Sequence, residues 1–573
     1  MTLKSVVRAR AGSRHCHSGR NCFAVVTATT AMLASLVVLA SPAAASPGAW
    51  SISPTPNAVS PQNNHLTGVS CASASFCVAA GYYSNGTVDQ NLLLTWNGSS
   101  WSLNSAASLS TSASQNNHLT SVSCASSSFC VAAGYYRGHY AILNLLLTWN
   151  GSTWSLNSAA SLSAKTMLSN YLTSVSCVSA SFCVAAGYYL TQSFTVWDQN
   201  LVLAWNGSSW LLNSAASLST SASVGNGLSG ISCVSARFCV AAGYYNSSAV
   251  SQNLLLTWNG STWNGSGWSL DAAASLSATT MLRNYLTSVS CAFAGYCVAA
   301  GYYNNGVADQ NLLLTWNGSS WSPNSTGSLS SSSSLNNQLT GVSCESMNFC
   351  VAVGYFSTYT ADQNLVLAWN GSTWNFNFAG SLSTSASQNN HLTSVSCASA
   401  SFCVAAGYYS NGTVDQNLLL TWNGSSWSRN SAASLSTSAS QNNHLTGVSC
   451  DYLSYCVAAG YYNNGTVDQN LLLAWNGSTW SLNSAASLST SASQDNHIAG
   501  ASCVFASFCA AAGTYYNGTV FQTAVLSYAS PPTQRGYWFV ASDGGIFSYG
   551  DAKFYGSMGG KHLNAPIVGV APA

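Results

Sequence analysis

Short apolar runs alternate with polar turns along the chain, and the same order of runs returns about every 53 residues. In the first copy, the runs cover residues 65–71 (HLTGVSC), 76–83 (FCVAAGYY), 90–96 (QNLLLTW) and 99–104 (SSWSLN). Runs of this length, rich in Val, Leu, Tyr and Trp and bounded by Ser, Asn and Gly, predict strands. Each copy therefore predicts four antiparallel strands.

Nine copies follow one another, and such a period indicates one small structural unit copied into a ring or an array. The steps are 53 residues, except for one of 56 and one of 58 that carry insertions near residues 190–197 and 263–268. Both faces of the predicted strands are apolar, so each sheet must be covered on both sides. Four-stranded sheets stacked face to face around an axis meet that need, which predicts an all-β propeller of about nine blades. A β-solenoid is the alternative architecture.

The two ends of the array complement each other. The ninth copy lacks its fourth run, and residues 50–53 (WSIS) before the first copy match the start of such a run. We therefore expect the N-terminal strand to complete the ninth blade and close the ring. Within each blade, Asn97-Gly98 predicts a two-residue type I′ hairpin turn, which sets Trp96 opposite Ser99 and Leu94 opposite Trp101.

Every copy carries two cysteines with the spacing C-x5-C. The pairs are Cys71/Cys77, Cys124/Cys130, Cys177/Cys183, Cys233/Cys239, Cys291/Cys297, Cys344/Cys350, Cys397/Cys403, Cys450/Cys456 and Cys503/Cys509. An even count at fixed spacing predicts one disulfide in each blade and an oxidising compartment. Zinc needs four ligands, whereas each copy offers two cysteines and no constant histidine. We therefore expect no metal and no cofactor.

The first 45 residues have the layout of a secretory signal peptide: a basic stretch, an apolar run at 23–40 and a small-residue site at 43–45. An uncleaved membrane anchor is the alternative. Removal of the signal peptide leaves eight basic and twelve acidic residues in the mature chain, so no basic surface remains to bind nucleic acid. The expected domains are the signal peptide (1–45), a nine-repeat propeller (46–530) and a C-terminal segment (531–573). The mature protein is expected to be exported, monomeric and without a membrane span.

Two motifs carry a family resemblance. The VSC-A-S-x-S-FCVAAG and LLLTWNGSSWS segments resemble repeats of secreted actinobacterial propeller proteins. The tail from residue 536 (GYWFVASDGGIFSYGD) resembles a second repeat type of the same proteins, present here in a single copy. A truncated array and an appended interaction segment are the two interpretations of that copy. The resemblance implies a propeller that accompanies cell-wall or surface modules, and it implies no particular activity.

Propeller topology places the cysteines at one end of the ring and a set of Tyr, Asp and amide residues at the other. In the first copy these are Tyr82, Tyr83, Asp89, Gln90 and Asn91, and the aspartate returns at Asp198, Asp309, Asp362, Asp415 and Asp468. Aromatic rings and amides are the groups that contact sugars. Ordinary turn residues are the alternative interpretation. Histidines precede the first strand at His65, His118, His391, His444 and His497, which a closed ring would place along one arc.

The predicted function is a secreted or cell-surface binding module, without catalytic residues, for carbohydrate or cell-wall polymer. No copy has a second constant carboxylate, and a glycosidase needs two of them about 5–10 Å apart. Repetition favours binding, because weak identical sites gain avidity along a polymer. The alternatives are a secreted glycoside-active enzyme, whose site would use residues of one blade such as the 190–197 insertion, and a purely structural surface protein. A surface protein is a further possible partner.

Overall fold

The computed structural model describes most of the chain between Ala49 and Tyr549. The residues outside the description are 1–48, 54–62, 105–108, 158–162, 164–168, 191–197, 214–224, 248–249, 259, 261–266, 272–282, 325–330, 333, 378–382, 431–435, 452–454, 476–478, 484–492, 505–507, 530–536, 541–545 and 550–573. The predicted signal peptide, the 190–197 insertion apart from Leu190, and most of the C-terminal segment therefore lie outside it. No helix long and apolar enough to cross a membrane occurs in the described part.

The strands form nine four-stranded antiparallel sheets, as the repeats predict. Blades 1 to 3 contain β2 (Asn64–Ser73), β3 (Phe76–Ser84), β4 (Asp89–Trp96) and β5 (Trp101–Asn104); β6 (Asn117–Ser126), β7 (Phe129–Arg137), β8 (Ile142–Trp149) and β9 (Trp154–Asn157); and β10 (Asn170–Ser179), β11 (Phe182–Leu190), β12 (Asp198–Trp205) and β13 (Trp210–Asn213). Blades 4 to 6 contain β14 (Asn226–Ser235), β15 (Phe238–Ser247), β16 (Val250–Trp258) and β17 (Trp268–Asp271); β18 (Asn284–Phe293), β19 (Tyr296–Asn304), β20 (Asp309–Trp316) and β21 (Trp321–Pro323); and β22 (Asn337–Ser346), β23 (Phe349–Ser357), β24 (Asp362–Trp369) and β25 (Trp374–Asn377).

Blades 7 and 8 contain β26 (Asn390–Ser399), β27 (Phe402–Ser410), β28 (Asp415–Trp422) and β29 (Trp427–Asn430); and β30 (Asn443–Asp451), β31 (Tyr455–Asn463), β32 (Asp468–Trp475) and β33 (Trp480–Asn483). Blade 9 contains β34 (Asn496–Val504), β35 (Phe508–Tyr516), β36 (Phe521–Ala529) and β1 (Ala49–Ser53). The C-terminal segment contributes the two-stranded sheet of β37 (Tyr537–Val540) and β38 (Ile546–Tyr549).

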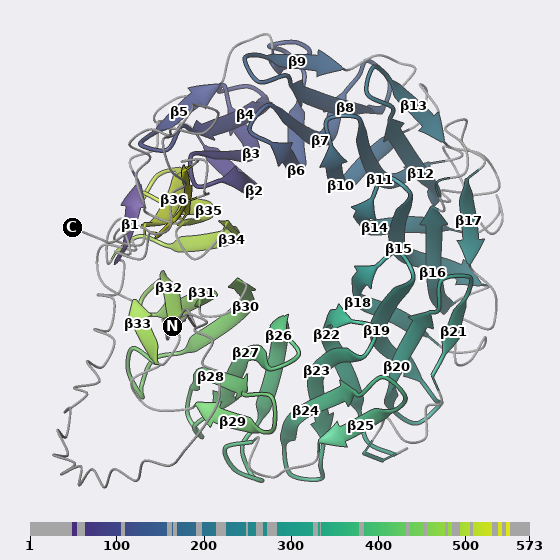
Figure 1. Cartoon of the computed structure of the whole chain (residues 1–573). Helices are drawn as coiled ribbons and strands as arrows, with labels where there is room; N and C mark the ends of the chain where they lie inside the picture. Colours follow the sequence, from purple (N-terminus) through teal and green to yellow (C-terminus); the bar gives the residue numbers. More distant parts are fainter. Residues whose placement is uncertain are drawn as a thin grey trace, which may run out of the picture. The chain divides into compact units, whose positions relative to one another are not determined.

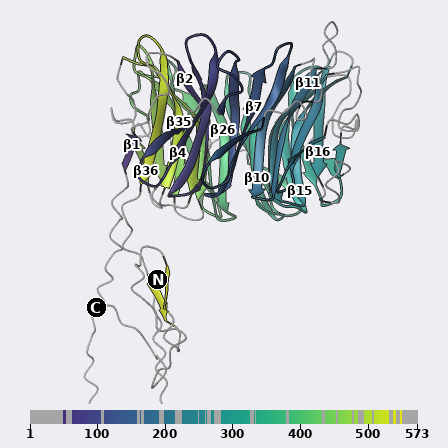
Figure 2. The ribbon, with the colours of Figure 1, turned by 90° about the horizontal axis from the view of Figure 1, so that it is seen from above.

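The blades follow one another around a ring, with the first strand of each nearest the axis (Figure 1). Seen from the side, the strands of the blades run between the same two ends of the ring (Figure 2). The N-terminal strand pairs with the last strand of blade 9, Trp50 opposite Tyr528. Blades 9 and 1 also share one apolar cluster, which includes Leu66 and Phe508. The predicted nine-bladed propeller closed by the N-terminal strand is therefore confirmed.

The core lies between neighbouring blades rather than within one sheet. Side chains on opposite faces of one strand, such as Leu92 and Leu93, are both fully buried. Leu92 packs in the cluster shared with blade 9, and Leu93 packs in the cluster shared with blade 2. Burial of apolar surface on both faces of every sheet is the main favourable contribution to this fold. It also explains why charged residues make up only 4% of the sequence.

Eight blades each carry one disulfide across the first hairpin. Cys71 lies directly opposite Cys77 in the β2–β3 register, and the same pairing recurs in the other blades. The bonds described are Cys71–Cys77, Cys124–Cys130, Cys177–Cys183, Cys233–Cys239, Cys291–Cys297, Cys344–Cys350, Cys397–Cys403 and Cys450–Cys456. So many disulfides indicate an oxidising compartment.

The prediction of nine disulfides differs from the described set at one pair, Cys503 and Cys509 in blade 9. The backbone register of β34 and β35 places Cys509 directly opposite Cys503, as in the other blades, and the side chain of Cys509 is fully buried. The side chain of Cys503 lies outside the description. Cys509 is disulfide-bonded, while the bond to Cys503 in particular is not among those described and stays a prediction.

The predicted type I′ turn at Asn97-Gly98 is wrong. The structure pairs Trp96 with Trp101, so the loop contains four residues rather than two. Asn97 causes the change, because its Oδ1 accepts the backbone N–H groups of Ser99 and Ser100, both at 2.9 Å. The register shifts by two residues, and a shift of two keeps each side chain on its face. Trp96 and Trp101 therefore still share one apolar cluster, as expected.

Two hydrogen bonds join most neighbouring blades near the axis. Thr340 Oγ1 of blade 6 donates to the carbonyl of Leu392 in blade 7 at 2.8 Å. The backbone N–H of Cys397 in blade 7 donates to Ser343 Oγ of blade 6 at 3.0 Å. Equivalent threonine bonds start from Thr67, Thr120, Thr173, Thr287 and Thr393.

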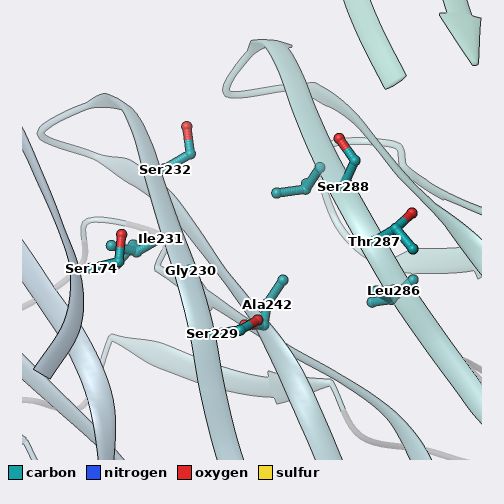
Figure 3. A pocket seen from close by; sticks show the side chains of 10 residues that line it. Ser174, Ser229, Gly230, Ile231, Ser232, Ala242, Leu286, Thr287 and Ser288 are labelled. Atoms are coloured by element: carbon teal, nitrogen blue, oxygen red, sulfur yellow. The ribbon is translucent and has the colours of Figure 1, made fainter. Parts of the chain in front are cut away.

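The junction between blades 4 and 5 departs from this pattern. Ser229 stands at the threonine position, and its hydroxyl donates to Ala242 of its own blade. A cavity of about 430 Å³ opens here between Ser229 and Ile231 on one side and Leu286 and Thr287 on the other (Figure 3). Farther from the axis the same two blades stay joined, through a shared apolar cluster.

Candidate functional site

The candidate site lies at the end of the ring opposite the disulfides. Here the first strand of a blade begins, the second ends and the third begins, so three positions come together. In blade 1 they are His65 on β2, Tyr82 directly opposite it on β3, and Asp89 at the start of β4. We call the ring of these three positions, repeated from blade to blade, the belt.

The belt side chains stack in an alternating row that crosses from blade to blade. In blades 6 to 8, Tyr355 contacts His391 with ring centroids 4.2 Å apart, and His391 stacks on Tyr408 at 5.3 Å. Tyr408 contacts His444 at 4.4 Å, and His444 stacks on Tyr461 at 5.2 Å. Each histidine therefore lies between the tyrosine of its own blade and the tyrosine of the preceding blade.

The same row runs through blades 1 to 3. His65, Tyr82, His118 and Tyr135 follow one another with centroid separations of 5.0, 4.3 and 5.2 Å. In blade 3, Tyr171 replaces the histidine and continues the row. Because the ring closes, the five predicted histidines do lie on consecutive blades, from blade 7 through blade 9 to blade 2. Among the described residues no group of His, Cys, Asp and Glu is arranged to hold a metal ion.

The side chains of five of the six belt aspartates contact the next blade. Three histidine–aspartate pairs join Nε2 to Oδ2: His118–Asp89 at 3.1 Å, His391–Asp362 at 3.0 Å and His444–Asp415 at 3.1 Å. Where the histidine is replaced, another donor takes its place. Gln338 Nε2 donates to Asp309 Oδ2 at 2.7 Å, and the Tyr244 hydroxyl donates to Asp198 at 3.4 Å. Asp468 accepts a hydrogen bond from Asn463 of its own blade.

Burial sets the charge of the belt. It lowers the pKa of His118, His391 and His444 below the usual value, and this effect outweighs the opposing attraction of the aspartates. The imidazoles are therefore mainly neutral at pH 7, and each pair is an N–H···carboxylate hydrogen bond rather than a full ion pair. Burial also raises the pKa of the belt tyrosines at the Tyr82 position, to about 12 for Tyr355. The belt thus presents protonated phenols, neutral imidazoles and carboxylates.

The predicted site residues fall into two groups in the structure. Tyr82 and the aspartates belong to the belt, and the carboxylate side chain of Asp89 remains 32% exposed. Gln90 and Asn91 are buried, and they hold the connection to the next blade: Gln90 Nε2 donates to the Gln115 carbonyl, and the Asn91 N–H donates to Ser110 Oγ. Tyr83 packs against the apolar cluster between blades 9 and 1.

The alternating row itself was missed at the level of sequence. The cysteine pairing alone, continued along a regular hairpin, sets His65 opposite Tyr83; the structure has a register shift between Leu66 and Gly68 that brings His65 opposite Tyr82 instead. The contact between Asp89 and His118 depends on the offset between two blades, and no local pattern encodes that offset. Arg283 replaces the usual asparagine just before the first strand of blade 5, and no sequence motif distinguishes it from the other arginines of the chain.

No protein-family model and no curated protein matches the sequence. Solved structures match with low similarity. One is a GH74 xyloglucanase from Xanthomonas campestris, with 11% identity, a TM-score of 0.31 and a match that covers 85% of this chain and 78% of that chain. Another is Sqt1 from Chaetomium thermophilum, with 10% identity, a TM-score of 0.35 and a match that covers 76% of this chain and 98% of that chain. A third is the β-propeller domain of the Trilobed protease from Pyrococcus furiosus, with 8% identity, a TM-score of 0.32 and a match that covers 64% of this chain and 97% of that chain. At these values the likeness carries no argument about function, and the resemblance to actinobacterial repeats stays a prediction.

Proposed function

We propose that the protein is an exported binding module whose belt holds a carbohydrate or cell-wall polymer. The observation that carries the proposal is the repetition of one polar arrangement, tyrosine with histidine and aspartate, on neighbouring blades. Stacked sheets are about 10 Å apart, so an extended polymer can reach several belt sites at once. Weak contacts on one chain then combine into useful avidity.

The chemistry of the belt suits hydroxyl groups. The ring faces of His391 and His444 are covered by tyrosines, so the belt offers polar edges rather than open aromatic faces. Within the described part of the chain, the hydroxyls of Tyr82, Tyr408 and Tyr461 make no hydrogen bond to the protein. A phenol can donate and accept, and the neighbouring carboxylates accept, which together satisfy sugar hydroxyls.

The first test is binding of the mature chain, residues 46–573, to a panel of polysaccharides and peptidoglycan. The second replaces Tyr82, Tyr408 and Tyr461 by Phe, singly and together, which removes the hydroxyls and keeps the stacked rings. Each lost hydrogen bond is worth about 1 kcal/mol, so affinity should fall about fivefold per substitution. The control is Tyr296→Phe, since Tyr296 is buried in the apolar cluster between blades 5 and 6.

Two outcomes would overturn the proposal. If the protein cleaves a glycan, and the triple Tyr→Phe variant cleaves it equally well, the secreted enzyme with a site in one blade is favoured. Absence of binding to every polymer in the panel would favour a purely structural surface protein.

A further inference from the structure

Blade 5 differs from most blades at one belt position and at the residue two positions before it. Arg283 stands just before β18, where blades 1, 2, 6, 7 and 8 have an asparagine, and Tyr285 stands at the histidine position. A cavity of about 290 Å³ opens at this point of the belt. The polar residues that line it are Arg283, Tyr285, Tyr302, Asn304, Asp309 and Asn336.

The acceptor side of this cavity is rigid. Asp309 Oδ1 accepts from Asn304 Nδ2 at 3.0 Å, and its Oδ2 accepts from Gln338 Nε2 at 2.7 Å. The backbone N–H of Asp309 donates to Asn336 Oδ1 at 3.0 Å, which ties β20 to the next blade. Gln338 is in turn held by the Tyr355 hydroxyl, 2.7 Å from its Oε1. A carboxylate oxygen has two lone pairs, so Asp309 can still accept a ligand hydroxyl.

The donor side is cationic. Arg283 is exposed, and it forms no ion pair with any acidic residue in the described part of the chain. Hydrogen bonding to Tyr285 raises the pKa of its guanidinium, so the group stays charged. A guanidinium pairs with a carboxylate through two parallel hydrogen bonds, and this geometry is more specific than a point charge.

We propose that this cavity is a subsite for a sugar unit that bears a carboxylate, such as a uronic acid. Arg283 binds the carboxylate, while Asp309, Asn304 and Asn336 bind hydroxyls. The volume of about 290 Å³ lies just below the range for drug-sized ligands, about 300–1,000 Å³, and fits one sugar ring. The fixed carboxylate of Asp309 repels a doubly charged phosphate more strongly than a singly charged carboxylate, because the repulsion between like charges grows with the charge.

The subsite deepens the proposed function and rests on it for its place in a polymer, but monosaccharides test it separately. Binding of glucuronate and of glucose to the mature protein is measured by calorimetry or saturation-transfer NMR. Arg283→Asn, which restores the residue of the neighbouring blades, should weaken glucuronate binding at least about tenfold and leave glucose unchanged. Arg237→Asn is the matched control, since Arg237 lies in the β14–β15 turn at the opposite end of the ring.

Three results would overturn the subsite. The first is that glucuronate does not bind detectably, and the second is that Arg283→Asn and Arg237→Asn weaken glucuronate binding equally. The third is that inorganic phosphate competes for the site as strongly as glucuronate does. The Tyr82, Tyr408 and Tyr461 variants should bind glucuronate normally. If they do, while wild-type protein binds no polymer, the proposed function fails and the subsite stands. If polymer binding follows the belt tyrosines but glucuronate does not bind, the subsite alone fails.

Discussion

Replacing Gly460 by alanine should disrupt blade 8 at its belt histidine. A Cβ on Gly460 would lie 1.8 Å from the carbonyl oxygen of His444, whereas a carbon–oxygen contact needs about 3.3 Å. The two strands would therefore have to separate by about 1.5 Å, against backbone atoms that cannot rotate away. Overpacking costs about 1–3 kcal/mol in ordinary cores, and this contact should reach the upper end or exceed it. The movement would also displace His444 from Asp415.

The matched control is Gly447→Ala in the neighbouring strand of the same blade, where a Cβ would meet nothing within 4 Å. Blade 7 has Ser394 at that position, so a side chain fits there naturally. Thermal unfolding of the mature protein, with its disulfides intact, measures both variants. Gly460→Ala should lower Tm by several degrees, and Gly447→Ala should change it by less than about 1 °C. Equal effects of the two substitutions would refute the packing described for the belt hairpins.

Three further predictions concern stability and local opening. Tyr296→Phe should stabilise the protein by about 1 kcal/mol in thermal unfolding, because the Tyr296 hydroxyl is buried without a partner among the described residues and blade 6 has Phe349 there. The three histidine–aspartate pairs should make Tm depend on pH. Because the pKa of each histidine is lower in the folded protein than its usual value of 6.5, the stability that these histidines contribute is fully present above pH 6.5 and is lost as the pH falls through their pKa values in the folded state. His391→Gln, which copies the contact of Gln338, should reduce that dependence. In hydrogen exchange, the amide of Cys291 at the open junction should exchange faster than that of Cys344, which donates to Ser290 Oγ.

Local sequence patterns were sufficient for the architecture. The strands, the number of blades, the pairing of the eight described disulfides and the closing role of residues 50–53 all depend on periodicity and on neighbouring residues. The hairpin after β4 was predicted incorrectly because the Asn97 side chain competes with the tight turn for backbone N–H groups. The length of this turn therefore depends on the Asn97 side-chain oxygen, which the Asn-Gly rule for two-residue turns does not take into account.

The candidate site was less accessible from sequence, because it forms between blades. Asp89 and Gln90 are adjacent in the chain, yet one side chain joins the belt and the other is buried under the connection to blade 2. Their separation follows from strand alternation combined with the packing of a loop that has no periodic pattern. The stacked row of histidine and tyrosine likewise requires the distance between two blades, which only the three-dimensional packing supplies.

Hydrogen exchange of the mature protein, with and without the polymer that binds it most tightly, tests the central claim most directly. The account predicts protection at the belt end, in the turn from Asn85 to Val88 and its counterparts in several neighbouring blades. Protection at the disulfide end instead, in the turn from Asn97 to Ser100 and its counterparts, would contradict the account, as would a panel in which no polymer binds.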